Sequence, residues 1–214
     1  MKKRYKMQKL MVAFFLLLIV LVGWVNNSIK EAEFQMNSQI PEQIQQKRSE
    51  YVKTEEIPED LFEAIVKAED HRYYYHFGID PIGMTRAAIV DIRAKSIVEG
   101  GSTLTQQLAK NLFLSSERTM KRKIKDMVLA VELEALYSKR EILAMYLNLV
   151  YFGEGAYGIG EAAEVYFQKS VSELTREECA LLAGIPRAPS LCNPIADQEG
   201  IMKRQQIILL KMGK

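Results

Sequence analysis

Two short stretches of the sequence carry side chains that could do chemistry. The first, "AEDHRYYYHFGID", places Glu69 and Asp70 at the end of a predicted helix, with His76 shortly after it. A carboxylate at the C-terminal end of a helix meets the negative end of the helix dipole, which disfavours its ionised form and suits a general base. A solvated acidic pair ahead of a turn, with the tyrosines as packing, explains the same stretch equally well when it is considered alone.

The second stretch, "GGSTLTQQLAKN", has the features of a helix start that binds an anion. Gly100 and Gly101 permit a close backbone approach. Ser102 or Thr103 can cap the helix, and the free N–H groups of a helix start attract negative charge. Lys110 adds a full positive charge, so a phosphate is the expected ligand. For this stretch by itself, an ordinary capped amphipathic helix is the favoured interpretation.

A dense group of cations follows this stretch. The segment "RTMKRKIKD" contains Asp126 and five cations, Arg118, Lys121, Arg122, Lys123 and Lys125. A basic helical face is usually solvated or in contact with anionic lipid headgroups. The whole chain has a net charge of only +2, which does not indicate a nucleic-acid-binding protein. A local cluster of this density in such a chain also suits a polyanionic substrate.

Helical periodicity predicts the elements that position these stretches. Apolar residues recur at helical spacing over 57–70, 82–95, 102–114, 119–137, 140–149 and 158–167. A capping box from Thr175 to Glu178 begins a further helix that ends at Gly184. No segment shows convincing strand alternation. A chain of 214 residues with 48% hydrophobic content can form one globular domain with an appendage, and we expect that domain to be mainly α-helical.

The appendage is an apolar segment near the N-terminus. Residues 1–9 carry five Lys or Arg, and residues 10–25 form an unbroken apolar run. We interpret this run as a single transmembrane anchor rather than a cleaved signal peptide, because no small-x-small cleavage site follows Val25. The run is shorter than the ~20 residues that usually span a bilayer. The basic flank predicts a cytoplasmic tail over 1–9, with the rest of the chain outside.

The remaining segments complete the predicted organisation. Residues 26–56 are polar and free of glycine, which predicts a stalk or linker ahead of a domain over 57–214. Cys179 lies in an apolar helical pattern and Cys192 in a proline-flanked loop, so we expect two free thiols rather than a disulfide, although the compartment would permit one. No cluster of His, Cys and Asp has metal-ligand spacing, so no metal site is predicted on the protein.

Taken in order, these motifs resemble those of the peptidoglycan glycosyltransferases, glycosyltransferase family 51. The set comprises Glu69–Asp70 with His76 and Gly78, then "GGSTLTQQLAKN", "RKIKD", "EILAMYLNLVYFG" and "GIGEAAEVYF", and it spans Ile57 to the C-terminus. The resemblance implies a lysozyme-like, two-lobed helical domain with a membrane-associated jaw over about 82–98. Because no Ser-x-x-Lys motif occurs, we expect the monofunctional, membrane-anchored type.

The resemblance also implies an activity and a set of site residues. The family polymerises lipid II into glycan strands on the outer face of the bacterial cytoplasmic membrane, by inverting transfer with release of undecaprenyl pyrophosphate. Glu69 would be the base that deprotonates the acceptor hydroxyl, and Asp126 the second catalytic carboxylate. The residues that would bind substrate are Asp70, His76, Ser102, Thr103, Gln106, Gln107, Lys110, Arg118, Arg122 and Lys123. Any Mg²⁺ or Mn²⁺ would sit mainly on the substrate diphosphate.

Two departures from the family pattern keep alternatives open. Asp126 stands where the family's basic motif ordinarily ends in glutamate, and Ala144 stands where an acid is usual. One alternative is therefore a catalytically weak or inactive relative that binds lipid II or a cell-wall synthesis partner. Another is a lytic enzyme that cleaves existing glycan, but such a hydrolase has no use for a basic pyrophosphate site.

Overall fold

The computed structural model describes residues 2–30, 32–94, 96, 100–114 and 119–213. Over these residues it is mainly helical, with two isolated bridges and no strand, so the expected fold class is confirmed. The α-helices are α1 Lys2–Ser28, α2 Ile40–Lys47, α3 Glu59–Glu69, α4 Pro81–Ala94, α5 Leu104–Phe113, α6 Met120–Leu136, α7 Lys139–Leu149, α8 Ile159–Phe167, α9 Arg176–Gly184 and α10 Gln198–Met212.

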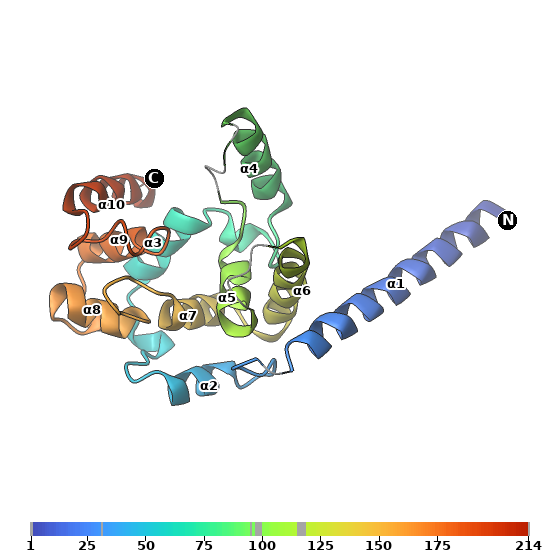
Figure 1. Cartoon of the computed structure of the whole chain (residues 1–214), viewed down its shortest axis with the longest axis horizontal. Coiled ribbons are helices and arrows are strands. Elements are labelled where there is room, and N and C mark those ends of the chain that lie inside the picture. Colours follow the sequence, from blue (N-terminus) through green and yellow to red (C-terminus); the bar gives the residue numbers. More distant parts are fainter. Residues whose placement is uncertain (1, 31, 95, 97–99, 115–118, 214) are drawn as a thin grey trace.

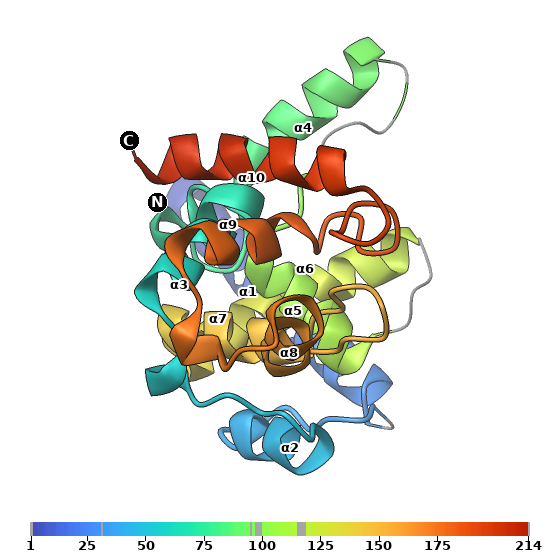
Figure 2. The same ribbon diagram turned by 90° about the vertical axis from the view of Figure 1, so that its left-hand side faces the viewer.

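The core forms around α7, which is buried from Ile142 to Leu149. Helix α5 packs on α6 and α7, while α3, α9 and α10 pack on one another. Figure 1 shows α1 and α4 projecting from this body of helices, and Figure 2 shows the projection of α4 from a second side. The lysozyme-like, two-lobed description stays a prediction.

Local sequence signals explain where the two helices that carry the predicted site begin and end. Helix α3 follows Pro58 and buries Leu61, Phe62, Ile65 and Val66 on one face. Helix α5 is capped by Thr103, whose Oγ1 accepts a hydrogen bond from the Gln106 N–H at 3.1 Å. The Gln106 side chain in turn accepts from the Thr103 N–H, which completes a capping box.

Helix α1 is long and apolar enough to cross a membrane. The apolar segment covers Lys9–Ser28, 20 residues, and is therefore longer than the run recognised from the sequence. Its C-terminal end contacts α6: Val25 is buried, and the Lys125 ammonium lies 5.2 Å from the centre of the Trp24 ring. The Asn26 side chain donates to Glu132 at 3.2 Å.

The segment expected to be a stalk contributes to the core. Phe34, Ile40 and Ile44 are buried in the same cluster as α7, and α2 packs on that helix. The Ile40 N–H donates to the Tyr137 hydroxyl at 2.9 Å, which joins α2 to the end of α6. The polar composition of this segment conceals the few apolar residues that anchor it.

The two cysteines are free, as expected from the sequence. Cys179 is buried in α9, and burial raises the pKa of its thiol to about 12. The reactive thiolate is therefore scarce at neutral pH, which suits a packing role.

Gly78 marks a close approach between the loop after α3 and the backbone of α6. Its φ is +75°, and a Cβ there would lie 2.8 Å from the carbonyl carbon of Ala130. We expect Gly78→Ala to lower the free energy of unfolding by about 2–4 kcal/mol, because left-handed strain adds to a clash with backbone. Gly155 has a similar φ of +81° with nothing within 4 Å of the added atom.

Denaturant unfolding of both variants tests this prediction. Gly155→Ala is the matched control, and it should lose only the ~1–2 kcal/mol of conformational strain. Equal losses at the two positions would show that contact with α6 is not what requires glycine at Gly78.

Candidate active site

A cavity of about 510 Å³ brings together most of the residues predicted to act on substrate. Those that line it are Glu69, Ser102, Gln106, Gln107, Lys110, Arg122 and Asp126. A larger hollow, about 830 Å³, is lined by residues of 50–56 and α8 and contains none of the predicted site residues. The smaller cavity is therefore the candidate active site.

Glu69, the last residue of α3, lies at this cavity with both carboxylate oxygens engaged. Its Oε2 accepts a hydrogen bond from the Gln107 side-chain amide at 3.2 Å. Its Oε1 lies 3.3 Å from the Arg204 guanidinium of α10, and the Glu69 side chain is 11% exposed. Burial lowers the pKa of Arg204, and the charge of Glu69 opposes that change. The two contacts hold the carboxylate in one orientation at the cavity.

A second contact orients the amide that contacts Glu69. The Tyr146 hydroxyl, which comes from the buried helix α7, donates to Gln107 Oε1 at 3.2 Å. Burial, reinforced by the charge of Glu69, raises the pKa of Tyr146 well above its usual range. Tyr146 therefore stays a neutral donor, and it fixes the Gln107 amide with its NH₂ toward Glu69.

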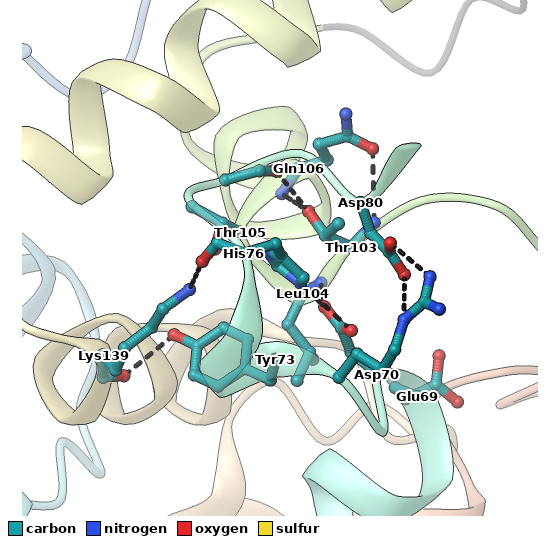
Figure 3. A network of polar contacts seen from close by, with 12 residues as sticks. Glu69, Asp70, Tyr73, His76, Asp80, Thr103, Leu104, Thr105, Gln106 and Lys139 are labelled. Atoms are coloured by element: carbon teal, nitrogen blue, oxygen red, sulfur yellow. Dashed lines mark hydrogen bonds and ion pairs between the residues drawn. The ribbon is translucent and has the colours of Figure 1, made fainter. Parts of the chain in front are cut away.

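Asp70, His76 and Thr103, which the sequence predicts to bind substrate, do not line this cavity. Asp70 Oδ2 accepts hydrogen bonds from the Leu104 N–H at 3.1 Å and from His76 at 3.0 Å (Figure 3). The Thr103 hydroxyl donates to the Gly78 carbonyl at 2.7 Å. These contacts join the end of α3, the loop after it and the start of α5, so they position the site.

A buried polar network supports the same loop from α6 and α7. The Lys139 ammonium donates to Glu134 at 2.7 Å. It also donates to the His76 carbonyl at 2.8 Å (Figure 3). The Thr105 hydroxyl also donates to Glu134 at 2.7 Å, while the Tyr73 hydroxyl donates to the Lys139 carbonyl at 2.9 Å. The network ties the start of α5 to α6, which carries the second predicted carboxylate.

Asp126, that second carboxylate, is buried in α6 with 3% exposure. Its Oδ2 accepts from the Arg122 guanidinium at 2.6 Å. Burial raises the pKa of Asp126, and the nearby charges of Arg122 and Lys123 oppose this. The Lys123 ammonium donates to Ser102 at 2.8 Å and to Gln106 Oε1 at 3.1 Å, and burial lowers its pKa.

Cations exceed carboxylates around the cavity. Among the described residues, six Lys or Arg side chains line it, Lys67, Arg86, Lys110, Arg122, Arg187 and Lys211, against the two carboxylates of Glu69 and Asp126. Arg118, which the sequence also predicts to bind substrate, lies outside the described residues. Such an excess of positive charge suits a ligand with several negative charges.

The sequence reasoning does not find several of these residues. Lys211 and Arg204 lie on α10, a helix that the spacing of apolar residues does not predict. Arg187 lies in the loop after α9, and Arg86 lies on α4 within a mixed apolar and basic pattern. Lys67 is two positions before Glu69 on α3, so its proximity to the base is the one signal that the sequence does offer.

Several known proteins are similar to this chain in sequence. The family model described as Transglycosylase matches residues 36–213. Penicillin-binding protein 1A of Aquifex aeolicus is 51% identical over 162 residues, which cover 76% of this chain and 22% of that protein. Penicillin-binding protein 1A of Vibrio cholerae is 46% identical over 179 residues, which cover 84% of this chain and 22% of that protein. Penicillin-binding protein 1A of Escherichia coli is 46% identical over 170 residues, which cover 79% of this chain and 20% of that protein. The chain spans about one fifth of the length of these relatives.

Proposed function

Because this chain belongs to the transglycosylase family, we propose that it polymerises lipid II into peptidoglycan glycan strands by inverting glycosyl transfer. The observation that carries the proposal is the position of Glu69, a carboxylate fixed by two contacts at a cavity lined mainly by cations. A base placed beside a binding site for a polyanion is what this reaction needs, since the leaving group is a diphosphate.

The reaction follows from this arrangement. Glu69 accepts the proton of the acceptor's 4-hydroxyl while that oxygen attacks the donor's anomeric carbon. The bond from that carbon to the lipid diphosphate breaks, and its electron pair leaves with the diphosphate. Lys110 and Arg122 line the same cavity and would stabilise the charge that develops on the leaving group. The product is a β-linked strand and undecaprenyl pyrophosphate.

The test is polymerisation by the full chain in detergent or vesicles. We expect labelled lipid II to give a glycan polymer that lysozyme digests. Persistent failure to form polymer under varied detergents and divalent metals would overturn the proposal, and release of soluble fragments from purified cell walls would favour the lytic alternative. Tight binding of lipid II without turnover would favour the inactive-relative alternative.

Membrane attachment forms part of the proposal. Helix α1 is long enough to anchor the chain in the bacterial cytoplasmic membrane, with the catalytic domain on the outer face. Exposed apolar residues on α4, Ile82, Ile89 and Ile92, support its contact with lipid. Residues 95, 97 and 98 of the expected jaw lie outside the described residues. The monofunctional type and any cell-wall synthesis partners stay predictions.

A divalent cation would be held mainly by the substrate. The described residues include no group of three His, Cys, Asp or Glu side chains able to hold a metal ion. We therefore assign no protein ligand to the expected Mg²⁺ or Mn²⁺ and derive no step through it.

Substitutions at Asp126 separate an active enzyme from a weak relative. We expect Asp126→Glu to raise the polymerisation rate a few-fold and Asp126→Asn to lower it about tenfold, because the carboxylate holds Arg122 at the site and a longer side chain reaches further. Initial rates on lipid II and thermal midpoints of both variants check this.

The size of the rate increase in Asp126→Glu decides between an active enzyme and a weak relative. A rise of more than a hundredfold for Asp126→Glu would favour the lipid II-binding alternative, since the natural protein would then be nearly inert. No effect from either substitution would remove Asp126 from the site.

A further inference from the structure

Two buried polar atoms in the candidate active site have no hydrogen-bond partner among the described residues. They are Gln106 Nε2 and Asp126 Oδ1. Both residues line the same cavity, and they are only 1% and 3% exposed. A buried donor or acceptor without a partner is destabilising, so such atoms are rare and call for a ligand or a bound water.

The orientation of the Gln106 amide follows from its other contacts. Its Oε1 accepts hydrogen bonds from the Thr103 N–H at 3.2 Å and from the Lys123 ammonium at 3.1 Å. Turning the amide over would place its NH₂ against these two donors. Nε2 is therefore fixed as an unpaired hydrogen-bond donor in a residue that lines the cavity.

Asp126 supplies the complementary group. The Arg122 guanidinium occupies its Oδ2 at 2.6 Å, which leaves Oδ1 as an acceptor. Helices α5 and α6 pack directly on each other (Figure 1). The Lys123 ammonium contacts Gln106, and the charge of Asp126 acts on it by raising its pKa against the effect of burial. Two residues that line the cavity thus hold an unpaired donor and an unpaired acceptor.

A secondary amide matches this pair, because its carbonyl accepts from Gln106 while its N–H donates to Asp126. A single hydroxyl would have to reach both atoms through one oxygen. We propose that Gln106 and Asp126 bind the 2-acetamido group of the sugar that carries the diphosphate. We choose that sugar because Arg122 donates a hydrogen bond to Asp126 and Lys123 donates one to Gln106. These two cations would attract the diphosphate, so the sugar attached to it lies beside the pair. This assignment rests on the proposed function and makes the pair a specificity determinant.

Substrate analogues provide the first test, using the full chain. In one lipid II analogue a hydroxyl replaces the 2-acetamido group of the diphosphate-bearing sugar, and in a second the same change is made on the outer sugar. We expect kcat/KM to fall about 10- to 100-fold for the first, since two buried groups lose their partners, and less than threefold for the second. Equal use of all three substrates, or discrimination against the second alone, overturns the assignment.

Variants provide the second test. Gln106→Glu keeps an oxygen for Thr103 and Lys123 but replaces the free donor with an acceptor, so the preference for lipid II over the first analogue should fall below threefold. Gln107→Leu is the matched neighbour, because its amide is engaged by Glu69 and Tyr146. It should slow both substrates alike and retain the preference. Retention of the full preference by Gln106→Glu contradicts the proposal.

Binding measurements separate this inference from the proposed activity. Dissociation constants for lipid II and the first analogue, measured with the Glu69→Gln chain, do not depend on turnover. A 10- to 100-fold difference supports the acetamido site even if polymerisation fails, and equal constants reject the site even if polymerisation succeeds. Should Gln106→Glu not fold, as judged by its thermal midpoint, Asp126→Asn takes its place with the same expected loss of preference.

Discussion

Glu69→Gln is expected to abolish most lipid II polymerisation, with a loss of about 10²–10⁴-fold, because it removes the positioned base without removing volume. The Gln107 amide contacts one carboxylate oxygen of Glu69 and the Arg204 guanidinium contacts the other, so both partners depend on this carboxylate. Asp126 is the other carboxylate that lines the cavity, and its Oδ2 is engaged by Arg122.

The measurement is the initial rate of polymer formation by the full chain at saturating lipid II. Glu63→Gln on the same helix is the control, since Glu63 lies 3.5 Å from Arg176 on the side of α9 and does not line the cavity. It should keep the wild-type rate within twofold, because a surface ion pair contributes little. Activity of Glu69→Gln above a few per cent of wild type would place the base elsewhere.

Thermal unfolding of Glu69→Gln shows whether a loss of activity comes from a loss of folded protein. Arg204 loses its counter-charge in this variant, but its side chain is 23% exposed, so solvent replaces part of that interaction. We expect a fall of only a few degrees in the thermal midpoint. Binding of lipid II by the variant should also survive, because the cations that line the cavity are unchanged.

Local signals predicted the helices that carry the site. Thr103, one of the two caps that the sequence offers, caps α5, the capping box between Thr175 and Glu178 forms as predicted, and α3 follows Pro58. A cap is formed by residues three positions apart, so it can be recognised without knowing the tertiary structure.

Local sequence signals do not predict helices α2 and α10, because few apolar residues lie on their buried faces. Helix α2 buries only Ile40 and Ile44, and α10 buries only Ile201, Ile208 and Met212 in fifteen residues. Gly200 in the first turn of α10 further weakens the helical pattern. Both helices gain their stability from packing on other elements, which periodicity in a single segment does not reveal.

Residue type alone could not separate the two neighbouring acids, Glu69 and Asp70. One turns toward the cavity and the other toward Leu104 and His76, because α3 ends between them. The pairing of Glu69 with Arg204 joins residues 135 positions apart, and it depends on how α10 packs on α3. Contacts of this range are set by the tertiary fold and leave no mark in the local sequence.

The second large effect is expected at Lys110, where Lys110→Ala should lower kcat by about 10²–10³-fold. Lys110 lies on α5 at the cavity that holds Glu69, and under the proposed function its charge would act where the diphosphate departs. Lys125 is the control from the same basic region. Its ammonium lies over the Trp24 ring at the end of α1, and Lys125 does not line this cavity.

Loss of Lys125 should therefore affect attachment rather than chemistry. We expect Lys125→Ala to keep the rate in detergent within a few-fold, since a cation–π contact at an exposed site contributes ~0.5–1 kcal/mol. Lys110→Arg should recover part of the rate lost in Lys110→Ala, because it restores the charge but not the shape of the ammonium. Equal losses for Lys110→Ala and Lys125→Ala on vesicles, with neither loss in detergent, would show that both cations serve attraction to the membrane and that the leaving group is stabilised elsewhere.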